Sequence, residues 1–544
     1  MATASLQQGI DREGWSRWRV ALGVALVAAV AVVALAVAVA LGSGVALAGD
    51  PVALARVTVG PFGGSIGHVQ ALGPDGRRVA LAVEGGKLTP LQKLAPGERV
   101  TVDVQVRRPG WLSWALGSER SEQLTLKAPA AHLTQRWITV GQGSPVRVSF
   151  QEPVSAVAYG GSGPLATHDL AHGTSSVSLG VRPATGALRI AAAPRSWESL
   201  GKPTLVSWFP PSSSAVMVSF PAAGAAIAPA TAIHLTFSKT VGEALGAALP
   251  KVSPATPGSW RQVDSHTLLF TPAGLGLALG SRLHIQLPRQ VAVTGPAGGA
   301  MRNVGQLEYT VPPGSTLRLQ QLLAQAGYLP VDWQPAGTEV ARTPAAEAQA
   351  AVNAPQGSFS WRFANTPGQL KAMWSPGQWN IITKGAVMKF ENENGMTADG
   401  AAGQQVWHTL LLRALAGARI QSGYSYVYVH REIPETMTLW HDGRIVLSSP
   451  ANTGISGAET ALGTYPVFEH IPEGTMSGTN PDGSHYEDPG IKWISYFNGG
   501  DALHNFDRSS FGTPQSLGCV ELPLAASAEV WPYTPIGTLV SIET

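Results

Sequence analysis

The hydrophobic positions along the chain follow three patterns in turn. An uninterrupted apolar run from Val20 to Leu41 contains no charged residue. As a helix it would be about 30 Å long, enough to cross the hydrocarbon core of a bilayer. Segments with period-two alternation follow, as in Arg99–Arg107 (RVTVDVQVR) and Val146–Phe150, and this alternation predicts β-strands. Helical spacing of apolar residues begins only near Pro313. The pattern therefore predicts one membrane helix, several β domains and a helical segment.

The apolar run predicts a transmembrane anchor over residues 20–48. No basic cluster follows this run, but three basic residues precede it, namely Arg12, Arg17 and Arg19. By the positive-inside rule, residues 1–19 lie in the cytoplasm and everything after the anchor lies on the outer side of the cell membrane, facing the cell wall. A cleavable signal peptide is the competing interpretation, because Ala46-Leu47-Ala48 fits a small-residue cleavage site. The apolar region of a signal peptide is only about 7–15 residues long, which favours the uncleaved anchor.

Alternating strands and Gly/Pro turns predict three β modules after the anchor. We expect an immunoglobulin-like sandwich over 52–130 and a second β domain over 131–212. A third module spans 216–312. Its Pro257-Gly258-Ser259-Trp260 string and a strand ending in Phe270-Thr271-Pro272 resemble bacterial immunoglobulin-like domains. These modules carry no polar cluster that indicates chemistry, so we expect them to act as spacers.

A helical module is predicted over 313–415. Its first helix ends at Gly327, a residue suited to a helix C-cap. The apolar positions of that helix are Leu317, Leu319, Leu322, Leu323 and Ala326. This helix, with the later Gly395–Gly400 region, resembles a peptidoglycan-binding-like domain interrupted by a long insert over 332–382. The resemblance implies contact with glycan or stem peptide, although a scaffold role fits the same residues.

Alternation returns in residues 423–544. Asp442-Gly443 between two alternating segments predicts a β-hairpin. A polar stretch from Glu469 to Gly490 is expected to form a solvated loop over the site. Histidine is a common zinc ligand, but no paired His/Cys spacing supports a metal site at the three histidines of this region, His470, His485 and His504. We expect no metal and no cofactor.

Composition narrows the class of protein further. Charged residues are 13% of the chain and the net charge is +2, so no nucleic acid partner is implied. A single cysteine excludes an intramolecular disulfide. The predicted fold class is mostly β and multidomain. It comprises an N-terminal transmembrane helix, immunoglobulin-like sandwiches, a small helical peptidoglycan-binding-like domain and a C-terminal β-rich catalytic domain.

The single cysteine is the strongest candidate for chemistry. Cys519 follows Gly518, and His504 stands close enough upstream to fold back onto it. A thiol with a pKa of about 8.5 needs such a base to act as a nucleophile at neutral pH. A buried structural cysteine is the alternative. A papain-like peptidase is disfavoured, because its cysteine precedes its histidine in the chain.

The residues around Cys519 resemble the signature of the L,D-transpeptidases of bacterial cell walls, the YkuD-type catalytic domain. That signature is a histidine, a loop, and then Ser-His-Gly-Cys-(Val/Ile)-(Arg/Asn). His504 fills the first position, and the second part reads Ser516-Leu517-Gly518-Cys519-Val520-Glu521. Leu517 replaces the usual second histidine, and Glu521 stands where Arg or Asn is frequent. Gly463–Val467 and the Tyr496-Phe497 pair are also similar to family motifs.

The resemblance implies an acyl transfer on peptidoglycan stem peptides with Cys519 as nucleophile and His504 as base. They would form a thiolate–imidazolium pair, and the carbonyl of Asn505 would orient the imidazole. Backbone N–H groups at Gly518 and Cys519 would form the oxyanion hole, and Ser516 would hold the loop. Four residues are expected to contact the substrate, namely Tyr496, Phe497, Leu517 and Glu521.

Three functions remain open from the sequence. The first is a membrane-anchored L,D-transpeptidase that crosslinks or remodels peptidoglycan through a thioester and releases D-Ala. The second is an L,D-carboxypeptidase, in which water replaces the acceptor amine. The third is a non-catalytic cell-wall-binding or adhesin-like protein with an unreactive Cys519. The presence of both nucleophile and base favours the first.

Overall fold

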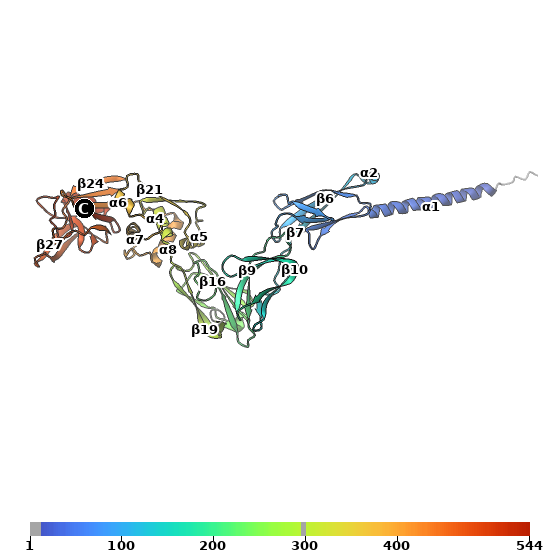
Figure 1. The fold of residues 1–544 in the computed structure, drawn as a ribbon, viewed down its shortest axis with the longest axis horizontal. Helices are drawn as coiled ribbons and strands as arrows, with labels where there is room; N and C mark the ends of the chain where they lie inside the picture. The colour runs from blue at the N-terminus through green and yellow to red at the C-terminus, as the bar shows by residue number, and fades with distance from the viewer. Residues whose placement is uncertain (1–11, 295–300) are drawn as a thin grey trace, which may run out of the picture. The chain divides into compact units, whose positions relative to one another are not determined.

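The computed structural model describes residues 12–294 and 301–544. The described chain is mostly β, as the alternating pattern predicts. It divides into two compact units, with the boundary between Pro211 and Ser212. The first helix, α1 (Arg12–Gly42), contains a segment, Trp18–Gly42, that is long and apolar enough to span a membrane. Figure 1 shows the elements by label.

The first unit contains three sheets. Its elements are β1 (Val45–Gly49), β2 (Ala55–Val59), β3 (Ser65–Leu72), β4 (Leu81–Glu84), β5 (Lys87–Pro90), β6 (Arg99–Arg107), α2 (Gly110–Leu116), β7 (Glu119–Lys127), β8 (Trp137–Thr139), β9 (Pro145–Gly160), β10 (Ala166–Val181), β11 (Gly186–Ala193) and β12 (Thr204–Phe209). The sheet orders are β1-β2-β5-β4, β3-β6-β7 and β10-β9-β11-β12-β8. The alternation predicted for β6 is confirmed, because all four of its valines are fully buried.

The second unit begins with a seven-stranded sheet in the order β15-β18-β13-β14-β17-β16, with β19 paired to β18. Its elements are β13 (Val216–Phe220), β14 (Ile233–Phe237), α3 (Val241–Leu245), β15 (Lys251–Ser253), β16 (Gly258–Asp264), β17 (Thr267–Pro272), β18 (Arg282–Thr294) and β19 (Met301–Thr310). Its core is built from the inward-facing apolar residues of these strands, including Ile233, Leu235 and Phe270.

Helices dominate the next part of the chain. Its elements are α4 (Thr316–Ala326), β20 (Val331–Pro335), α5 (Pro344–Val352), β21 (Gly357–Trp361), α6 (Gly368–Ala372), α7 (Ile381–Glu393) and α8 (Gln404–Ala416). Gly327 ends α4 with a φ of 90°, so its predicted role as a C-cap is confirmed. The 332–382 insert contains regular elements of its own, the β20–β21 hairpin and two short helices.

The remaining chain forms two sheets, β24-β23-β22-β30-β25 and β26-β27-β28-β29. The elements are β22 (Ser425–His430), β23 (Thr436–His441), β24 (Arg444–Pro450), β25 (Gly463–Pro466), β26 (Glu469–Thr479), β27 (His485–Asn498), β28 (Asp501–Asn505), β29 (Val520–Leu522), α9 (Leu524–Val530), a 3₁₀ helix η2 (Trp531–Tyr533) and β30 (Leu539–Glu543). The predicted Asp442-Gly443 hairpin is confirmed as the β23–β24 turn, with both residues at positive φ.

The prediction of a loop from Glu469 to Gly490 is wrong. This stretch forms most of a long antiparallel hairpin, β26–β27, whose residues pair from Glu469–Tyr496 to Thr479–His485. Much of the hairpin is solvated, so exposed polar residues alternate along both strands. This polar composition is also typical of a loop, which explains the wrong prediction. The turn at its tip is closed by the Asn480 N–H, which donates to the Ser484 carbonyl at 2.8 Å.

Candidate active site

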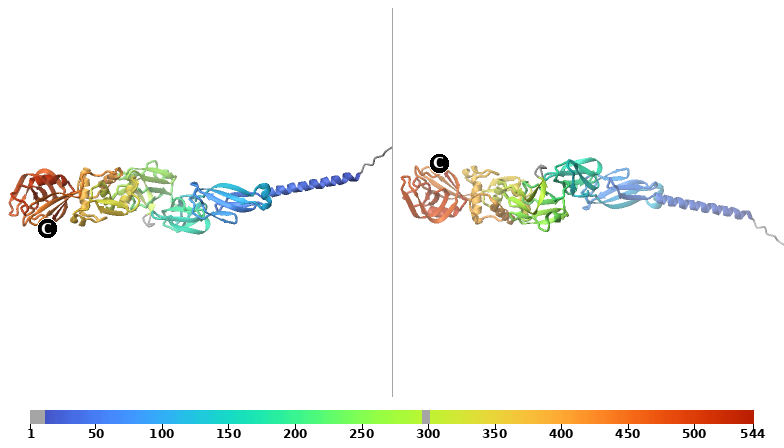
Figure 2. Two further views of the ribbon diagram at one scale, coloured as in Figure 1. Left: turned by 90° about the horizontal axis from the view of Figure 1, so that it is seen from above. Right: turned by 90° about the horizontal axis from the view of Figure 1, so that it is seen from below.

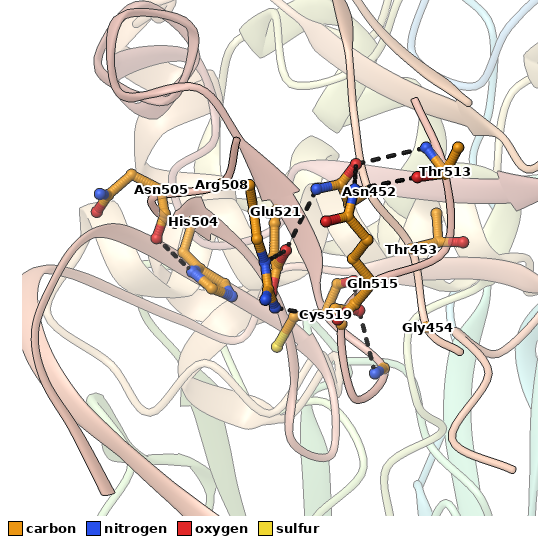
Figure 3. A network of polar contacts seen from close by, with 12 residues as sticks. Asn452, Thr453, Gly454, His504, Asn505, Arg508, Thr513, Gln515, Cys519 and Glu521 are labelled. Carbon is orange, nitrogen blue, oxygen red and sulfur yellow. Dashed lines mark hydrogen bonds and ion pairs between the residues drawn. The ribbon is translucent and has the colours of Figure 1, made fainter. Parts of the chain in front are cut away.

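The candidate base lies on β28, and the candidate nucleophile directly precedes β29, the neighbouring parallel strand. β28 and β29 pair so that His504 is opposite Glu521. Since side chains alternate across a sheet, Ala502, His504 and Glu521 project to one face, and Cys519 packs beside Ala502 on that face. Leu503 and Val520 project to the other face, into the apolar core. His504 and Cys519 thus share one surface of the sheet (Figure 3).

His504 is held in one orientation by its neighbour. Its Nδ1 lies 2.7 Å from the carbonyl oxygen of Asn505. A carbonyl only accepts, so Nδ1 carries the proton and Nε2 is left with the lone pair that a base needs. The ring is 3% exposed, and this burial lowers the pKa of His504 below its usual value. At neutral pH the imidazole is therefore uncharged.

Cys519 is a thiol at neutral pH. Burial raises the pKa of the Cys519 thiol to about 12, an effect that the N–H of Ala502 partly offsets and the nearby acids Asp501 and Glu521 reinforce. Its Sγ lies 3.5 Å from the Gly500 carbonyl oxygen, and the side chain keeps part of its surface accessible. These two pKa shifts favour the neutral thiol and imidazole over the thiolate–imidazolium pair expected from the sequence, because a low-dielectric site disfavours both charges.

The backbone conformation of the loop before Cys519 depends on Gly518 and Ser516. Gly518 has a φ of 115°, and a Cβ at this position would lie 2.4 Å from Asp501 Oδ1. Buried Ser516 donates from Oγ to the Cys519 carbonyl at 2.6 Å and accepts from the Gly518 N–H at 3.3 Å. Ser516 thus takes up one of the two N–H groups expected in the oxyanion hole and leaves that of Cys519 as the stronger candidate.

Glu521 is not a free negative charge. Arg508 binds its carboxylate with two bonds, from Nε at 2.8 Å and from Nη2 at 2.7 Å. The Glu521 side chain is buried, whereas that of Arg508 is about one third exposed and its guanidinium lies 4.5 Å from the Phe506 ring centre. A cation therefore lies beside position 521, on Arg508. Sequence reasoning missed it, because Arg508 lies outside the short motif.

A buried asparagine joins the loop to this ion pair. Asn452 Oδ1 accepts from the N–H of Gly512 at 3.0 Å and from Gln515 Nε2 at 3.2 Å, while its backbone pairs with that of Glu521. Figure 3 shows Asn452 on the opposite side of Glu521 from His504. Asn452 is fully buried. It therefore fixes the loop that leads to Cys519 against β29.

A second buried polar group, around the Glu435 carboxylate, also holds the loop that leads to Cys519. Both oxygens of the Glu435 carboxylate accept bonds from Thr453, at 2.6 Å each. Thr460 Oγ1 accepts from the Gly454 N–H at 2.9 Å and contacts the Cys519 carbonyl at 3.5 Å. These residues are fully buried or nearly so. No sequence signal pointed to them, because each is an ordinary polar residue whose partner is distant in the chain.

The four predicted substrate contacts lie in different surroundings. Phe497 is 3% exposed and packs in the core on the face away from the site, where a substrate cannot reach it. Glu521 is bound by Arg508. Tyr496 and Leu517 are partly exposed. Tyr486 lies on the hairpin and was not singled out by the sequence. Burial raises the pKa of its hydroxyl and the nearby Cys519 adds to this effect, and the same holds for Tyr496.

Within residues 12–294 and 301–544, no group of three or more His, Cys, Asp or Glu side chains is arranged to hold a metal ion. His470 instead stacks on Trp531 with ring centres 4.1 Å apart, and its Nε2 lies 3.0 Å from the Trp531 carbonyl. The neutral imidazole and thiol at the site need no metal for acyl transfer to a cysteine.

Comparisons with known proteins point to one family. Residues 425–542 match the model of the YkuD family, the L,D-transpeptidase catalytic domain. No curated protein matches the chain. Similar solved structures include an L,D-transpeptidase from Mycobacterium smegmatis, 12% identical over 61% of this chain and 100% of that chain, with a TM-score of 0.21. The catalytic domain of an Enterococcus faecium L,D-transpeptidase is 26% identical over 22% of this chain and 95% of that chain, with a TM-score of 0.20.

Proposed function

Since residues 425–542 match the L,D-transpeptidase catalytic domain of the YkuD family, we propose that this chain is a membrane-anchored enzyme that crosslinks peptidoglycan stem peptides through a thioester on Cys519. One observation carries the proposal. Inside that domain, His504 on β28 and Cys519 directly before β29 lie on the same face of the sheet, and the lone pair of His504 is at Nε2, which supports their roles as base and nucleophile.

The first half-reaction begins from the neutral pair. His504 Nε2 takes the thiol proton as Sγ attacks the carbonyl carbon of the amide between the third stem residue and D-Ala. The oxyanion that forms is stabilised by backbone N–H groups, with that of Cys519 as the main candidate. When the intermediate collapses, the C–N bond breaks, the imidazolium gives its proton to the leaving amine, and D-Ala departs.

The second half-reaction forms the crosslink. An amine from the side chain of a neighbouring stem peptide attacks the thioester carbonyl, and His504 takes the proton that this amine loses. The C–S bond breaks, and the departing sulfur recovers a proton from the imidazolium. Because the pKa of Cys519 is high, the thiol form is restored at once. Tyr486 and Tyr496 flank the thiol and are proposed as the walls that receive the stem peptides.

The retained membrane anchor is supported by the strand that follows it. β1 pairs with β2 along its whole length, from Val45–Val59 to Gly49–Ala55. Val45 is buried in the core of the first unit. Cleavage after Ala48 would remove most of this strand and expose the edge of β2. We therefore propose that α1 stays attached, with residues 1–19 in the cytoplasm and the catalytic domain on the outer side of the membrane.

The upstream modules are proposed to act as spacers, and the helical part as a contact for the cell wall. The helical part and the catalytic sheet share one apolar core, in which Leu410 and Phe390 lie with Tyr426, Trp440 and Leu539. This shared core indicates that the helical part stabilises the catalytic domain, in addition to any binding of glycan or stem peptide.

Intact-mass analysis of the protein with a tetrapeptide stem and an acceptor amine tests the proposal. We expect an adduct on Cys519 that has lost D-Ala, followed by a crosslinked product. Cys519→Ala and His504→Ala should both lack the adduct and the product. Loss of D-Ala without a crosslink would show a carboxypeptidase instead, and a folded protein that forms no adduct would overturn the enzymatic proposal.

A further inference from the structure

The end of α1 is bound rigidly to the first sheet. A loop, residues 60–63, folds around it. The Phe62 N–H donates to the Gly42 carbonyl at 3.0 Å, and the Gly60 N–H donates to the Gly44 carbonyl at 2.8 Å. The fit is close, since a Cβ on Gly60 would lie 2.3 Å from the Gly42 oxygen. These bonds satisfy carbonyls at the helix end that would otherwise lack partners. Figure 2 shows α1 leading directly into this unit.

Three aromatic side chains are exposed beside this junction, and we term them the aromatic cluster: Phe62 (37% exposed), Trp111 (56%) and Trp114 (86%). The rings of Phe62 and Trp111 meet edge to face with centres 6.1 Å apart. The short helix α2 that carries both tryptophans is fastened to the domain by Leu112, which is 6% exposed. The cluster is therefore displayed outward on a fixed support.

Water is an unfavourable environment for such a cluster. Each aromatic ring exposes a large apolar area, and contiguous exposed apolar groups mark contact surfaces. Tryptophan is enriched where a membrane meets water, because one side of its ring is apolar and its N–H is polar. An exposed cation lies beside the loop, since Arg107 pairs with Ser65 at the end of β6. The rings and the cation together suit the surface of a lipid bilayer, where anionic phosphates lie above apolar lipid chains.

The depth of the cluster agrees with such a surface. The span from Trp18 to Gly42 is about 36 Å long as a helix, slightly more than the hydrocarbon core of about 30 Å. Trp18, 74% exposed, stands at one end of this span, and Phe62 contacts Gly42 at the other. Aromatic residues thus flank both ends of the apolar segment, as they do in membrane-spanning helices.

We propose that the aromatic cluster inserts into the outer headgroup region of the bilayer that α1 crosses, so that the first domain contacts the lipid surface and is fixed in orientation there. The proposal rests on the membrane anchor proposed above. It assigns to the first domain a lipid-binding face, and hence a role in fixing the direction in which the rest of the chain leaves the membrane.

Spin-label depth measurements on the full chain test this proposal. Cys519→Ser removes the only cysteine. Trp114→Cys then carries one nitroxide, and Trp114 is exposed enough that its replacement leaves the core intact. The matched control is Val181→Cys in the same background, because Val181 is also an exposed apolar residue of this unit (66%). The protein is reconstituted in vesicles of phosphatidylcholine and phosphatidylglycerol, and flotation of the vesicles reports the anchor independently.

We expect the label at 114 to be accessible to oxygen and protected from a water-soluble nickel chelate, whereas the label at 181 meets the chelate freely. A protein that floats with the vesicles but carries a water-accessible label at 114 would overturn the lipid contact and leave the anchor standing. A label at 114 shielded from both reagents would show a protein contact instead and would also overturn it. A protein that fails to float would overturn the anchor and the lipid contact together.

Discussion

At the scale of single residues, the nucleophile and the base of the site are both uncharged before a substrate binds. Burial lowers the pKa of His504 and raises that of Cys519, so the proton stays on sulfur until a substrate arrives. A substrate that excludes water and brings a carbonyl to Sγ makes the proton transfer productive, since the charge then passes to an oxyanion held by backbone donors. We therefore expect Cys519 to react slowly with small electrophiles that bring no such environment.

The first prediction concerns this slow reactivity. A thiol with a pKa of about 12 has far less thiolate at pH 7 than a free cysteine with a pKa of about 8.5. We expect alkylation of Cys519 by iodoacetamide at pH 7 to be roughly a hundredfold slower, or more, than that of a cysteine peptide. The rate should keep rising above pH 10, where the peptide has reached its plateau. Mass spectrometry over a pH series measures both, and a plateau near pH 8 would contradict the neutral pair.

The second prediction concerns the ion pair beside the base. Arg508 lowers the pKa of His504 and Glu521 raises it. Removing the cation in Arg508→Gln should therefore raise the pKa of His504 and move the acid limb of the kcat/KM profile to higher pH. Glu521→Gln removes the opposing charge and should move the same limb to lower pH.

Stability separates this effect from simple damage at the ion pair. Arg508→Gln leaves Glu521 buried without its partner, which should cost about 1–3 kcal/mol in urea unfolding. Adding Glu521→Gln should restore part of that loss. Limbs that move in the same direction in the two single variants would contradict the electrostatic account.

The third prediction concerns the residue before the nucleophile. Gly518→Ala adds a Cβ where φ is 115° and Asp501 Oδ1 lies 2.4 Å away, so the loop must shift and carry Sγ out of position. We expect kcat to fall about 100-fold, the cost of a displacement near 1 Å. Asp501→Ala in the same chain relieves the clash but not the backbone strain, so recovery should be partial. Wild-type acylation in Gly518→Ala would show that the loop tolerates the shift.

At the scale of elements, two parallel strands and one hairpin make the site. β28 and β29 are short, and their register puts His504 opposite Glu521, so that a shift by one residue would turn His504 toward the core. Cys519, directly before β29, packs beside Ala502 on the same face as His504. The β26–β27 hairpin brings Tyr486 toward the thiol from a distant part of the chain. Its alternating polar pattern keeps it solvated while its ladder keeps it extended.

The fourth prediction tests the hairpin as a substrate wall. Tyr486→Ala should lower kcat/KM for a tetrapeptide stem about tenfold, mainly through KM, because an aromatic contact surface is lost. Tyr486→Phe keeps the ring and should retain most of the activity. Chloroacetamide alkylation of Cys519 should be unchanged in both variants, since Tyr486 does not act as the base. Equal loss in the two variants would assign the effect to the hydroxyl group instead.

At the scale of the whole molecule, the boundaries between modules differ in kind. The helical part and the catalytic sheet share an apolar core, so they form one continuous body. At the other end of the chain, α1 continues into β1, a strand that the first sheet needs. The helix α1, proposed above as the membrane anchor, is thus joined to the first domain by a folded element, and we expect a cut close to the domain to destabilise it.

The fifth prediction compares two truncations at this junction. A chain that begins at residue 44 keeps β1, whereas one that begins at residue 50 lacks it. Loss of Val45, which is buried, and Leu47, which is partly buried, should destabilise the first sheet by about 2–4 kcal/mol. Calorimetry should show a lower Tm for the transition of the first unit in the shorter chain only. Equal transitions would show that β1 is dispensable, as a cleaved signal peptide requires.

The sequence by itself determined the parts that depend on local pattern. The alternation of β6, the end of α4 at Gly327 and the Asp442-Gly443 turn follow from residues that are neighbours in the chain. The pairing of His504 with Cys519 could also be inferred, because a cysteine after glycine and an upstream histidine form a recognisable motif.

Only the tertiary structure decided the electrostatic state of the site and the roles of distant polar residues. Whether Cys519 is a thiol or a thiolate depends on burial, which the packing of the second sheet sets. Glu521 resembled a free acid in the sequence, and Arg508 became its partner only when the loop folded back. Asn452 and Glu435 acquired their functions in the same way, since hydrogen bonds between residues far apart in the chain leave no local pattern.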